Sequence, residues 1–367
     1  MATSNKRVLI YRLGSLGDTV VALPAFHKIR DTFPDADITL LTNHPVAQKA
    51  APLESVLGRG YFFNSAVNYP IGTRDMRVLY ALNRHIRSLN IDVLIYLTSA
   101  RKSKTALASR LAVLRDEWFF RLAGIKKIIG LPKGNEDFEV CFDPNTQRFE
   151  WEAQRLVRRL QLLGAIPLEE DHYWDLHLSN EELETAKEVL RPCEAEKPIF
   201  VISTGTKRQA NDWEEHNWLQ LLEQLQTVLT GWQLVIIGAN EEAARAHKCL
   251  GAWGGAGINL CGKTAPRVSA AILKQGQVFI GHDSGPMHLA ACVGTPCVAI
   301  FSARNFPGQW YPRGNFNKII YHQTDCAGCG LETCIVQQKK CILSITVADV
   351  KNAVMEIVDN KLKTYYK

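Results

Sequence analysis

The chain has 367 residues, with 43 Lys and Arg against 37 Asp and Glu, which gives a formal net charge of +6 at pH 7. Apolar residues make up 46% of the sequence and charged residues 22%, proportions that exclude a disordered, collagen-like or low-complexity chain. At about 150 residues per domain, this length predicts two domains.

No apolar run comes near the roughly 18 residues that a membrane-spanning helix needs. Residues 1–12 contain a short apolar run that Arg12 interrupts, and they have no small-residue cleavage site, so they do not resemble a signal peptide. Both observations predict a cytoplasmic protein. Its ten cysteines are then expected to be reduced thiols or metal ligands rather than a disulfide framework.

The basic residues are too dispersed to predict a nucleic-acid-binding surface. The modest positive charge instead fits an anionic small substrate. The C-terminal tail contains Lys361, Lys363 and Lys367. It is either a solvated basic surface or a peripheral contact with the anionic inner face of the cytoplasmic membrane.

The first half of the chain alternates strand and helix. Short apolar runs predict strands at residues 8–11, 38–41 and 92–96. Apolar residues at helical spacing predict helices over residues 20–29 and 78–89. Such alternation is typical of crossover units on a parallel sheet.

The same alternation returns after a charged helical segment at residues 150–163. Ser179 and Glu182 form the pattern of a capping box, which predicts a helix that runs to Leu190. Predicted strands follow at residues 199–202, 234–237, 278–280 and 298–301, and predicted helices at residues 218–225, 241–250 and 285–293. Thr346 and Asp349 are placed to cap a last helix.

These elements predict an α/β protein with two Rossmann-like domains. We assign residues 1–172 to an N-terminal domain, residues 173–345 to a C-terminal domain and residues 346–367 to a C-terminal helix and basic tail. Open parallel sheets bind ligands beyond the carboxyl ends of their strands. Two such sheets that face each other would place their loops around one central cleft.

The first candidate site is the turn after residues 8–11. Gly14 and Gly17 allow the backbone to approach a ligand closely, with Ser15 between them. Asp18 would stand at a helix N-terminus, where the helix dipole favours a carboxylate. It is either a helix cap or the general base of a reaction at the mouth of the cleft.

The second candidate site is the turn after residues 278–280. The backbone N–H groups of Ser284, Gly285 and Met287 lie at a predicted helix N-terminus, which is suited to phosphate. Asp283 precedes them, and His288 lies one turn into the helix. The structural alternative is a well-capped helix without a ligand.

A third set of polar residues follows two other predicted strands. After residues 199–202 come two hydroxyls and two adjacent cations, at Thr204, Thr206, Lys207 and Arg208. This combination suits a departing diphosphate, or is simply a solvated basic loop. Glu242 follows residues 234–237, where a carboxylate can hold ribose hydroxyls in a Rossmann-like domain, or lies on a surface helix.

Four of the ten cysteines lie within 16 residues, at Cys326, Cys329, Cys334 and Cys341. Four thiolates can close a tetrahedral site for structural zinc or iron. Packed reduced thiols and a partial disulfide are the other two interpretations.

Two of these motifs together resemble a known family. Gly14 to Asp18, followed by residues 19–25, is similar to the opening of the bacterial lipopolysaccharide heptosyltransferases, glycosyltransferase family nine. Asp283 to Ala291, with Gly-Thr-Pro at residues 294–296, resembles the signature of their second domain. The motifs occur in this order about 265 residues apart, and the similarity extends over nearly the whole chain.

The resemblance implies a GT-B architecture and an inverting transfer that requires no cofactor. The donor would be a nucleotide sugar, usually ADP-heptose, held mainly by the second domain, and the acceptor a lipid-linked glycan such as the lipopolysaccharide core. Asp18 matches the proposed general base, residues 283–288 match the site for the donor diphosphate and sugar, and Glu242 matches a ribose contact.

The sequence departs from the family pattern at one position. Heptosyltransferases often have a lysine shortly before the tryptophan that matches Trp213, and this sequence has Asn211 there. Lys207 and Arg208 are the nearby cations that could replace its charge. Two alternatives remain: a transferase that uses a UDP-, GDP- or dTDP-hexose, and a sugar-nucleotide epimerase or non-catalytic nucleotide-binding protein.

Overall fold

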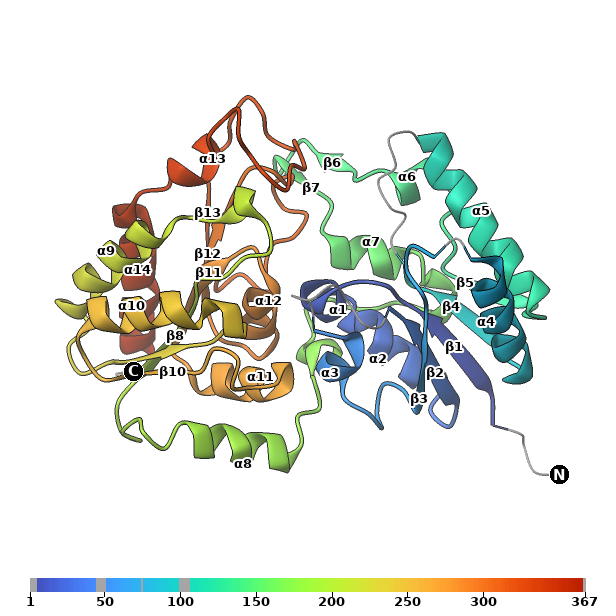
Figure 1. The fold of residues 1–367 in the computed structure, drawn as a ribbon, viewed down its shortest axis with the longest axis horizontal. Helices are drawn as coiled ribbons and strands as arrows, with labels where there is room; N and C mark the ends of the chain where they lie inside the picture. Colours follow the sequence, from blue (N-terminus) through green and yellow to red (C-terminus); the bar gives the residue numbers. More distant parts are fainter. Residues whose placement is uncertain (1–4, 44–50, 74, 99–105, 366–367) are drawn as a thin grey trace. The chain divides into compact units, whose positions relative to one another are not determined.

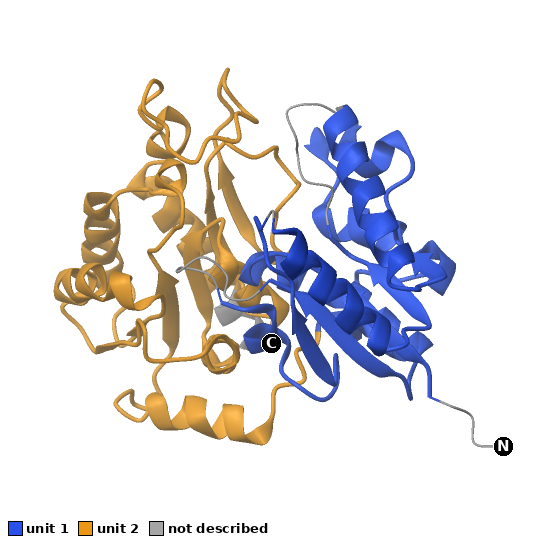
Figure 2. Ribbon diagram, turned by 45° about the vertical axis from the view of Figure 1, so that its right-hand side comes forward, with its two compact units in different colours: residues 1–174 blue, residues 175–367 orange. Residues whose placement is uncertain are grey.

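The computed structural model describes residues 5–43, 51–73, 75–98 and 106–365 (Figure 1). The chain divides into two compact units, Met1–Trp174 and Asp175–Lys367 (Figure 2). Each unit has its own parallel sheet, so the predicted α/β fold with two Rossmann-like units is confirmed.

The first unit is built on a five-stranded sheet. Its strands are β1 (Arg7–Tyr11), β2 (Asp37–Thr42), β3 (Ser65–Asn68), β4 (Val93–Tyr96) and β5 (Lys127–Ile129). They lie in the order β3-β2-β1-β4-β5, and all pairings are parallel. The order reverses between β1 and β4, which is the point where Rossmann-like sheets bind ligands. The three strands predicted from sequence are β1, β2 and β4.

The helix predicted over residues 20–29 is in fact two helices, α1 (Leu16–Val21) and α2 (Leu23–Thr32). The break falls at Ala22, which ends α1 and precedes α2. Pro24 has no backbone N–H, so it cannot donate a helical hydrogen bond across this break. As a consequence α1 is short and starts directly after the glycine turn, with Asp18 in its first turn.

The remaining elements of the first unit are labelled in Figure 1 where there is room. They are α3 (Leu53–Leu57), α4 (Met76–Ser88), α5 (Ala106–Leu122), α6 (Asn135–Phe138), the hairpin β6 (Phe142–Asp143) and β7 (Arg148–Phe149), α7 (Glu152–Arg158), and the 3-10 turns η1 (Gln161–Leu163) and η2 (Asp171–Trp174). Leu82 and Ile86 of α4 and Phe120 of α5 pack on Leu9, Tyr11 and Leu94 of the sheet, and these residues form one core of the unit.

The second unit repeats this design with six parallel strands. They are β8 (Ile199–Ser203), β9 (Gln233–Ile236), β10 (Gly257–Asn259), β11 (Val278–His282), β12 (Cys297–Phe301) and β13 (Lys318–Tyr321). The order is β10-β9-β8-β11-β12-β13, so the reversal lies between β8 and β11. Strands β8, β9, β11 and β12 are buried almost throughout, as expected of strands covered on both faces.

The helices of the second unit are α8 (Asn180–Val189), η3 (Gln209–Asn211), α9 (Glu215–Gln226), η4 (Asn240–Glu242), α10 (Ala243–Trp253), α11 (Pro266–Gln275), α12 (Gly285–Cys292), α13 (Lys340–Leu343) and α14 (Val347–Tyr365). The predicted capping box is present, because the Glu182 N–H donates to Ser179 Oγ and the Ser179 N–H donates to Glu182 Oε2. Thr346 and Asp349 likewise cap α14.

The C-terminal helix α14 is part of the core of this unit. Val350 and Val354 are fully buried against the sheet, together with Trp213 and Trp218. The indole N–H of Trp213 donates to the Ile345 carbonyl at 2.8 Å, which fixes the start of α14.

The described ranges contain no helix with the length and apolar character needed to cross a membrane. Of the predicted basic tail, Lys367 lies outside the described residues, and so do the side chains of Lys361 and Lys363.

Candidate active site

The turn between β1 and α1 places Asp18 at the carboxyl end of the first sheet. Ser15 is the N-cap of α1, and Asp18 Oδ2 accepts hydrogen bonds from the Ser15 N–H at 2.8 Å and the Ser15 hydroxyl at 2.7 Å. Among the described residues, Oδ1 accepts no hydrogen bond. The half-buried carboxylate therefore caps the helix with one oxygen and keeps the other for a further partner.

Gly14 has a specific steric role in this turn. A Cβ atom on Gly14 would lie 2.6 Å from the Asp18 Cβ atom, so a larger residue would displace the carboxylate. The Gly14 N–H and carbonyl both bond to the side chain of Asn43, at 2.9 and 3.2 Å. Gly14, Ser15, Gly17 and Asp18 thus form one loop anchored to the end of β2.

Two buried arginines, which the sequence analysis did not single out, lie behind this loop. Arg12 donates to the backbone oxygens of Asp18 at 2.6 Å and Leu97 at 2.7 Å, which joins α1 to the segment after β4. Arg159 donates to the Thr98 carbonyl at 3.1 Å. Burial, and then the charge of Arg155, lowers the pKa of Arg159 to about 10. Arg12 could have been noticed, because a charge directly after a buried strand has to be paired.

In the second unit, the loops after β8 and β9 bring two predicted donor-site residues together. A Cβ atom on Gly205 would lie 1.7 Å from Glu242 Oε1, and one on Gly238 would lie 2.0 Å from Glu242 Oε2. The Glu242 side chain therefore lies directly on the backbone of both loops. Its Oε2 accepts a hydrogen bond from the Ala239 N–H at 3.2 Å. Thr204 is buried next to Gly205 at the end of β8.

The turn after β11 has the features of an anion site. Ser284 is the extended N-cap of α12, and its side chain makes no capping hydrogen bond. Its Oγ is buried, and none of the described residues forms a hydrogen bond with it. The N–H groups of Gly285 and Met287, in the first turn of the helix, have no helical partner either. Asp283 accepts a hydrogen bond from Asn305 Nδ2 at 2.8 Å, so this carboxylate is oriented by the loop after β12.

His288 in α12 and His282 at the end of β11 have different environments. His288 is buried in α12, with the ring of Trp310 at a centroid distance of 6.4 Å. His282 is fully buried, and burial lowers its pKa to about 4 against the opposing charge of Asp212. The neutral ring accepts a hydrogen bond at Nε2 from the Trp213 N–H at 3.1 Å. We infer that His282 holds the segment after β8 in place through this hydrogen bond to Trp213.

That loop is also held by an ion pair that the sequence did not reveal. Arg245 of α10 donates to both carboxylate oxygens of Asp212, at 2.9 and 3.1 Å, and to the Thr204 carbonyl at 3.2 Å. Burial alone would raise the pKa of Asp212, but the hydrogen bonds from Arg245 outweigh it and lower the pKa. The end of β8 is therefore fixed to α10, the helix that follows Glu242.

Lys207 and Arg208 lie on the exposed part of the same loop. The Arg208 N–H bonds to Thr206 Oγ1 at 3.3 Å, and the Arg208 guanidinium pairs with Glu332 at 3.7 Å. The buried guanidinium of Arg304 lies near them, where burial and then the charge of Arg208 lower its pKa. This loop therefore carries positive charge next to the carboxyl ends of β8 and β12.

The position at which the family often has lysine is buried here. Asn211 Oδ1 accepts a hydrogen bond from the Ser302 hydroxyl at 2.6 Å. A cation reaches the adjacent residue from elsewhere in the chain, because Lys339 Nζ donates to the Asp212 carbonyl at 2.9 Å and pairs with Glu214. Lys339 is thus a buried cation near this position, in addition to Lys207 and Arg208, from which we expected the positive charge.

The four-cysteine segment packs against the β8 loop. Cys334 and Cys341 are buried, Cys326 is half-buried and Cys329 is exposed. The Cys334 N–H donates to Gln209 Oε1 at 2.8 Å, and Cys334 Sγ accepts from the Lys339 N–H at 3.4 Å. All ten cysteines lie in the described ranges and are free thiols, so the partial-disulfide interpretation is wrong for this structure.

A metal site needs three or four ligand side chains that converge on one point. Within the described residues, no three or more Cys, His, Asp or Glu side chains are placed so that they could hold one metal ion. A bound metal deprotonates the cysteines that hold it, so the metal-site interpretation stays a prediction.

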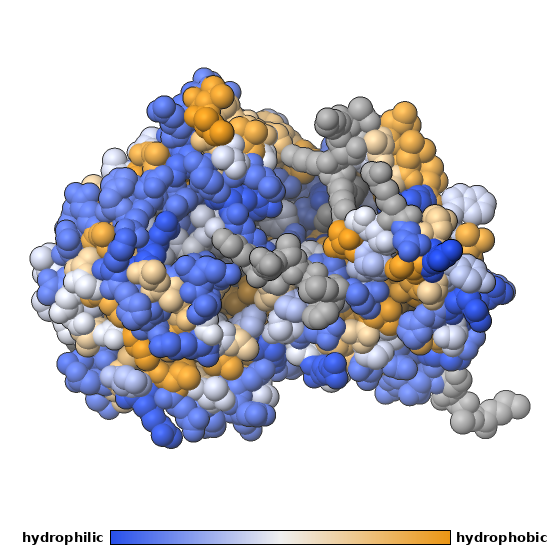
Figure 3. All heavy atoms as spheres, viewed as in Figure 1, coloured by the Kyte–Doolittle hydropathy of each residue, from blue (hydrophilic) through white to orange (hydrophobic). Residues whose placement is uncertain are grey.

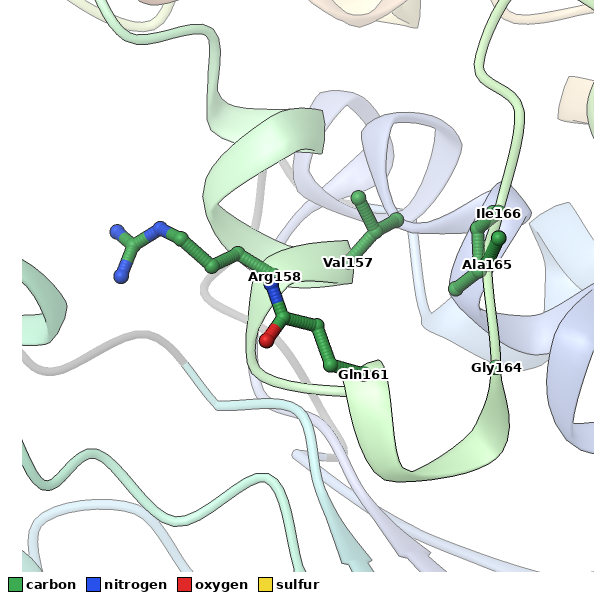
Figure 4. A pocket seen from close by; sticks show the side chains of 6 residues that line it. All are labelled: Val157, Arg158, Gln161, Gly164, Ala165 and Ile166. Atoms are coloured by element: carbon green, nitrogen blue, oxygen red, sulfur yellow. The ribbon is translucent and has the colours of Figure 1, made fainter.

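A surface pocket of about 400 Å³ in the first unit does not belong to this site. It is lined by Val157, Arg158, Gln161, Gly164, Ala165 and Ile166. Figure 4 shows the Arg158 side chain pointing away from Gly164 and Ala165, and its guanidinium is paired with Glu150 and Asp137. The pocket therefore contains no predicted site residue and no available charged group.

Comparison with known proteins identifies a family and a fold that this chain matches. The family model for glycosyltransferase family 9 (heptosyltransferase) matches residues 81–340. Lipopolysaccharide heptosyltransferase 1 of Pseudomonas aeruginosa is 22% identical over 351 residues, covering 90% of this chain and 88% of that protein.

Solved structures agree on the fold. The glycosyl transferase family 9 protein from Veillonella parvula superimposes with a TM-score of 0.69 at 16% identity, over 98% of this chain and 99% of that chain. The iron-containing dodecameric heptosyltransferase TibC, solved in complex with ADP-D-beta-D-heptose, has a TM-score of 0.52 at 14% identity, over 98% of this chain and 79% of that chain.

Proposed function

The chain belongs to glycosyltransferase family 9, the heptosyltransferases, and we propose that it transfers heptose from ADP-heptose to the lipopolysaccharide core or another surface glycan, with inversion at the anomeric carbon. The observation that carries this proposal is the family match over residues 81–340, which includes parts of both units. The carboxylate at the end of β1 and the unoccupied hydrogen-bonding groups at the start of α12 support it.

We assign the acceptor to residues 1–172 and the donor to residues 173–345. Asp18 would take the proton of the acceptor hydroxyl through Oδ1, the oxygen that no described residue occupies. The acceptor oxygen then forms a bond to the anomeric carbon, and the bond from that carbon to the diphosphate oxygen breaks. The departing diphosphate takes the electron pair of that bond.

The second unit would stabilise this leaving group without a metal ion. The N–H groups at the start of α12 and the cations Lys207 and Arg208 provide positive potential where negative charge develops. Thr204 and Thr206 supply hydroxyls in the same loop, and Asp283 and His288 would contact the donor sugar and phosphates. Glu242 would hold the ribose hydroxyls, because its carboxylate lies over the ends of β8 and β9.

A donor screen in the presence of EDTA tests this assignment. We expect ADP-heptose to be consumed when a lipid-linked or core-glycan acceptor is present, and ADP to raise the melting temperature more than UDP, GDP or dTDP. Stabilisation by another nucleotide would replace ADP-heptose by a different hexose donor. Epimerised donor without glycan transfer would show an epimerase and contradict the proposal.

We further infer that the four cysteines are packed thiols that support the donor loop. The expected result is no stoichiometric zinc or iron in protein purified without chelators, because the sulfurs do not form a ligand set among the described residues. One iron or zinc per chain that is lost in Cys329→Ser would refute this inference and would align the chain with iron-containing TibC.

A further inference from the structure

Helix α5 exposes a continuous row of large apolar side chains. They are Leu107 (67% exposed), Leu111 (56%), Leu114 (49%), Trp118 (67%) and Leu122 (67%). Steps of four, three, four and four residues keep all five within about 80° of arc, since each helical residue turns about 100°. Figure 3 shows hydrophobic surface in the region where Figure 1 draws α5.

This row is not needed for the core of the first unit. The opposite side of α5 already packs inward, where Val113 and Phe120 are buried. Asp116, on the same side, accepts a hydrogen bond from the buried Tyr96 hydroxyl at 2.9 Å. The helix is thus docked through one face and leaves a second apolar face in solvent. Single exposed apolar residues are ordinary, but an ordered row of five indicates a binding surface.

Positive charge borders the apolar row on both sides. Arg110 and Arg121 lie on one side of the row and Arg115 on the other, by the same helical geometry. Lys126 and Lys127 follow the end of the helix and are exposed. Two of these arginines have acidic partners within the helix, because Arg115 pairs with Asp116 and Arg121 with Glu117. Arg110, Lys126 and Lys127 outnumber the acidic residues that remain on this side, so the border keeps a net positive charge.

The neighbouring helix α4 extends this surface. Its Asn83 side chain donates to the Phe119 carbonyl of α5 at 2.7 Å, so the two helices lie side by side. Met76 and Tyr80, one turn apart, are 73% and 66% exposed. The helix also contains three exposed arginines, Arg77, Arg84 and Arg87, and no acidic residue.

We propose that the α4–α5 surface, defined by these exposed residues of Met76–Ser88 and Ala106–Leu122, binds the surface of an anionic phospholipid bilayer. Leucine and tryptophan would enter the region between headgroups and acyl chains, and the flanking arginines would meet lipid phosphates. A second copy of the chain fits less well, since like charges on the two surfaces would face each other. A nucleic acid is disfavoured because the centre of the surface is apolar.

This proposal goes beyond the transfer reaction. It depends on the proposed function in one respect: a protein that uses a lipid-linked acceptor would meet that acceptor at a membrane surface. It also differs from the interaction expected of the C-terminal tail, because it lies in the other unit and combines apolar with basic residues.

Sedimentation with vesicles tests the proposal. We expect the full chain to bind vesicles of phosphatidylcholine with phosphatidylglycerol, to bind pure phosphatidylcholine weakly, and to release from anionic vesicles as salt increases. The double variant Leu111→Gln/Trp118→Gln should lower the vesicle partition coefficient about tenfold or more, because apolar burial in the interface is lost. Both side chains are exposed, so the fold should be retained.

The matched control is Ile335→Gln/Val336→Gln, which removes two side chains that are 77% and 90% exposed in the second unit. This variant should bind vesicles as the unaltered chain does. Equal vesicle binding by the α5 variant, or no binding by the unaltered chain, would overturn the proposal. A dimer that the α5 variant abolishes, without lipid binding, would show a protein interface instead and would equally overturn it.

Activity on a water-soluble acceptor fragment separates this proposal from the proposed function. The α5 variant should transfer sugar to such a fragment at the rate of the unaltered chain. Vesicle binding without any transferase activity would leave the lipid surface intact and remove the proposed reaction. Transfer to the soluble fragment without vesicle binding would support the proposed reaction and remove the proposed lipid surface.

Discussion

Replacing Asp18 with asparagine should lower turnover by about 10²–10⁴-fold while ADP binding stays unchanged. The asparagine side-chain oxygen can still accept the hydrogen bonds from the Ser15 N–H and hydroxyl that Asp18 Oδ2 accepts now. The cap of α1 is therefore retained, and the capacity to take a proton is lost. Steady-state kinetics with ADP-heptose and calorimetric ADP binding would measure both quantities.

Two further variants separate the cap from the base. Ser15→Ala removes the hydroxyl that donates to Asp18 Oδ2, at a cost of about 1 kcal/mol, but keeps the carboxylate and its bond from the backbone N–H of residue 15. It should retain most of the turnover. Asp18→Ala removes both cap and base and should lose stability as well as turnover. If Asp18→Asn were as active as the unaltered chain, Asp18 would be only a helix cap.

The central strands of both sheets were predictable because they are continuous apolar runs. Covering a strand on both faces removes the alternation of polar and apolar residues and leaves runs such as residues 298–301. The edge strands β3, β5, β10 and β13 were not predicted, since they have three or four residues and include polar or half-exposed positions.

The helix α5 was missed for a different reason. Its leucines and tryptophan recur at helical spacing but face solvent, so they lack the core-facing pattern by which the other helices were predicted. For Asp18 the structure shows a capping-box carboxylate whose Oδ2 accepts two hydrogen bonds, and its role as a base stays a prediction.

The supports of the donor loop could not be predicted from local sequence at all. Asp212 pairs with Arg245, 33 residues away, and receives a hydrogen bond from Lys339, 127 residues away. Such residues lie at no regular spacing in the sequence, because only the arrangement of strands and helices in the folded unit brings them together. Ser284, in contrast, could be predicted from sequence, because the glycine and proline that follow it indicate a turn at the start of a helix.

The second large effect is expected at Gly205. Gly205→Ala should weaken ADP binding roughly 10- to 100-fold, as expected when hydrogen bonds to a charged group are lost. The new Cβ atom would lie 1.7 Å from Glu242 Oε1, so the carboxylate has to move away from the loop. Because the clash involves the end of a flexible side chain, the fold should persist. Calorimetric titration with ADP and thermal unfolding would show reduced affinity at nearly unchanged stability.

Glu242 is the residue through which Gly205 should act, and this makes the effect testable by a double-mutant cycle. Glu242→Ala alone should weaken ADP binding to a similar degree, and adding Gly205→Ala should then cost little more. Gly251→Ala is the matched control, because a Cβ atom at Gly251 meets nothing within 4 Å and the residue lies in α10. Unchanged ADP affinity in Gly205→Ala would contradict a ribose contact at Glu242, since the displaced carboxylate would then have had no ligand to hold.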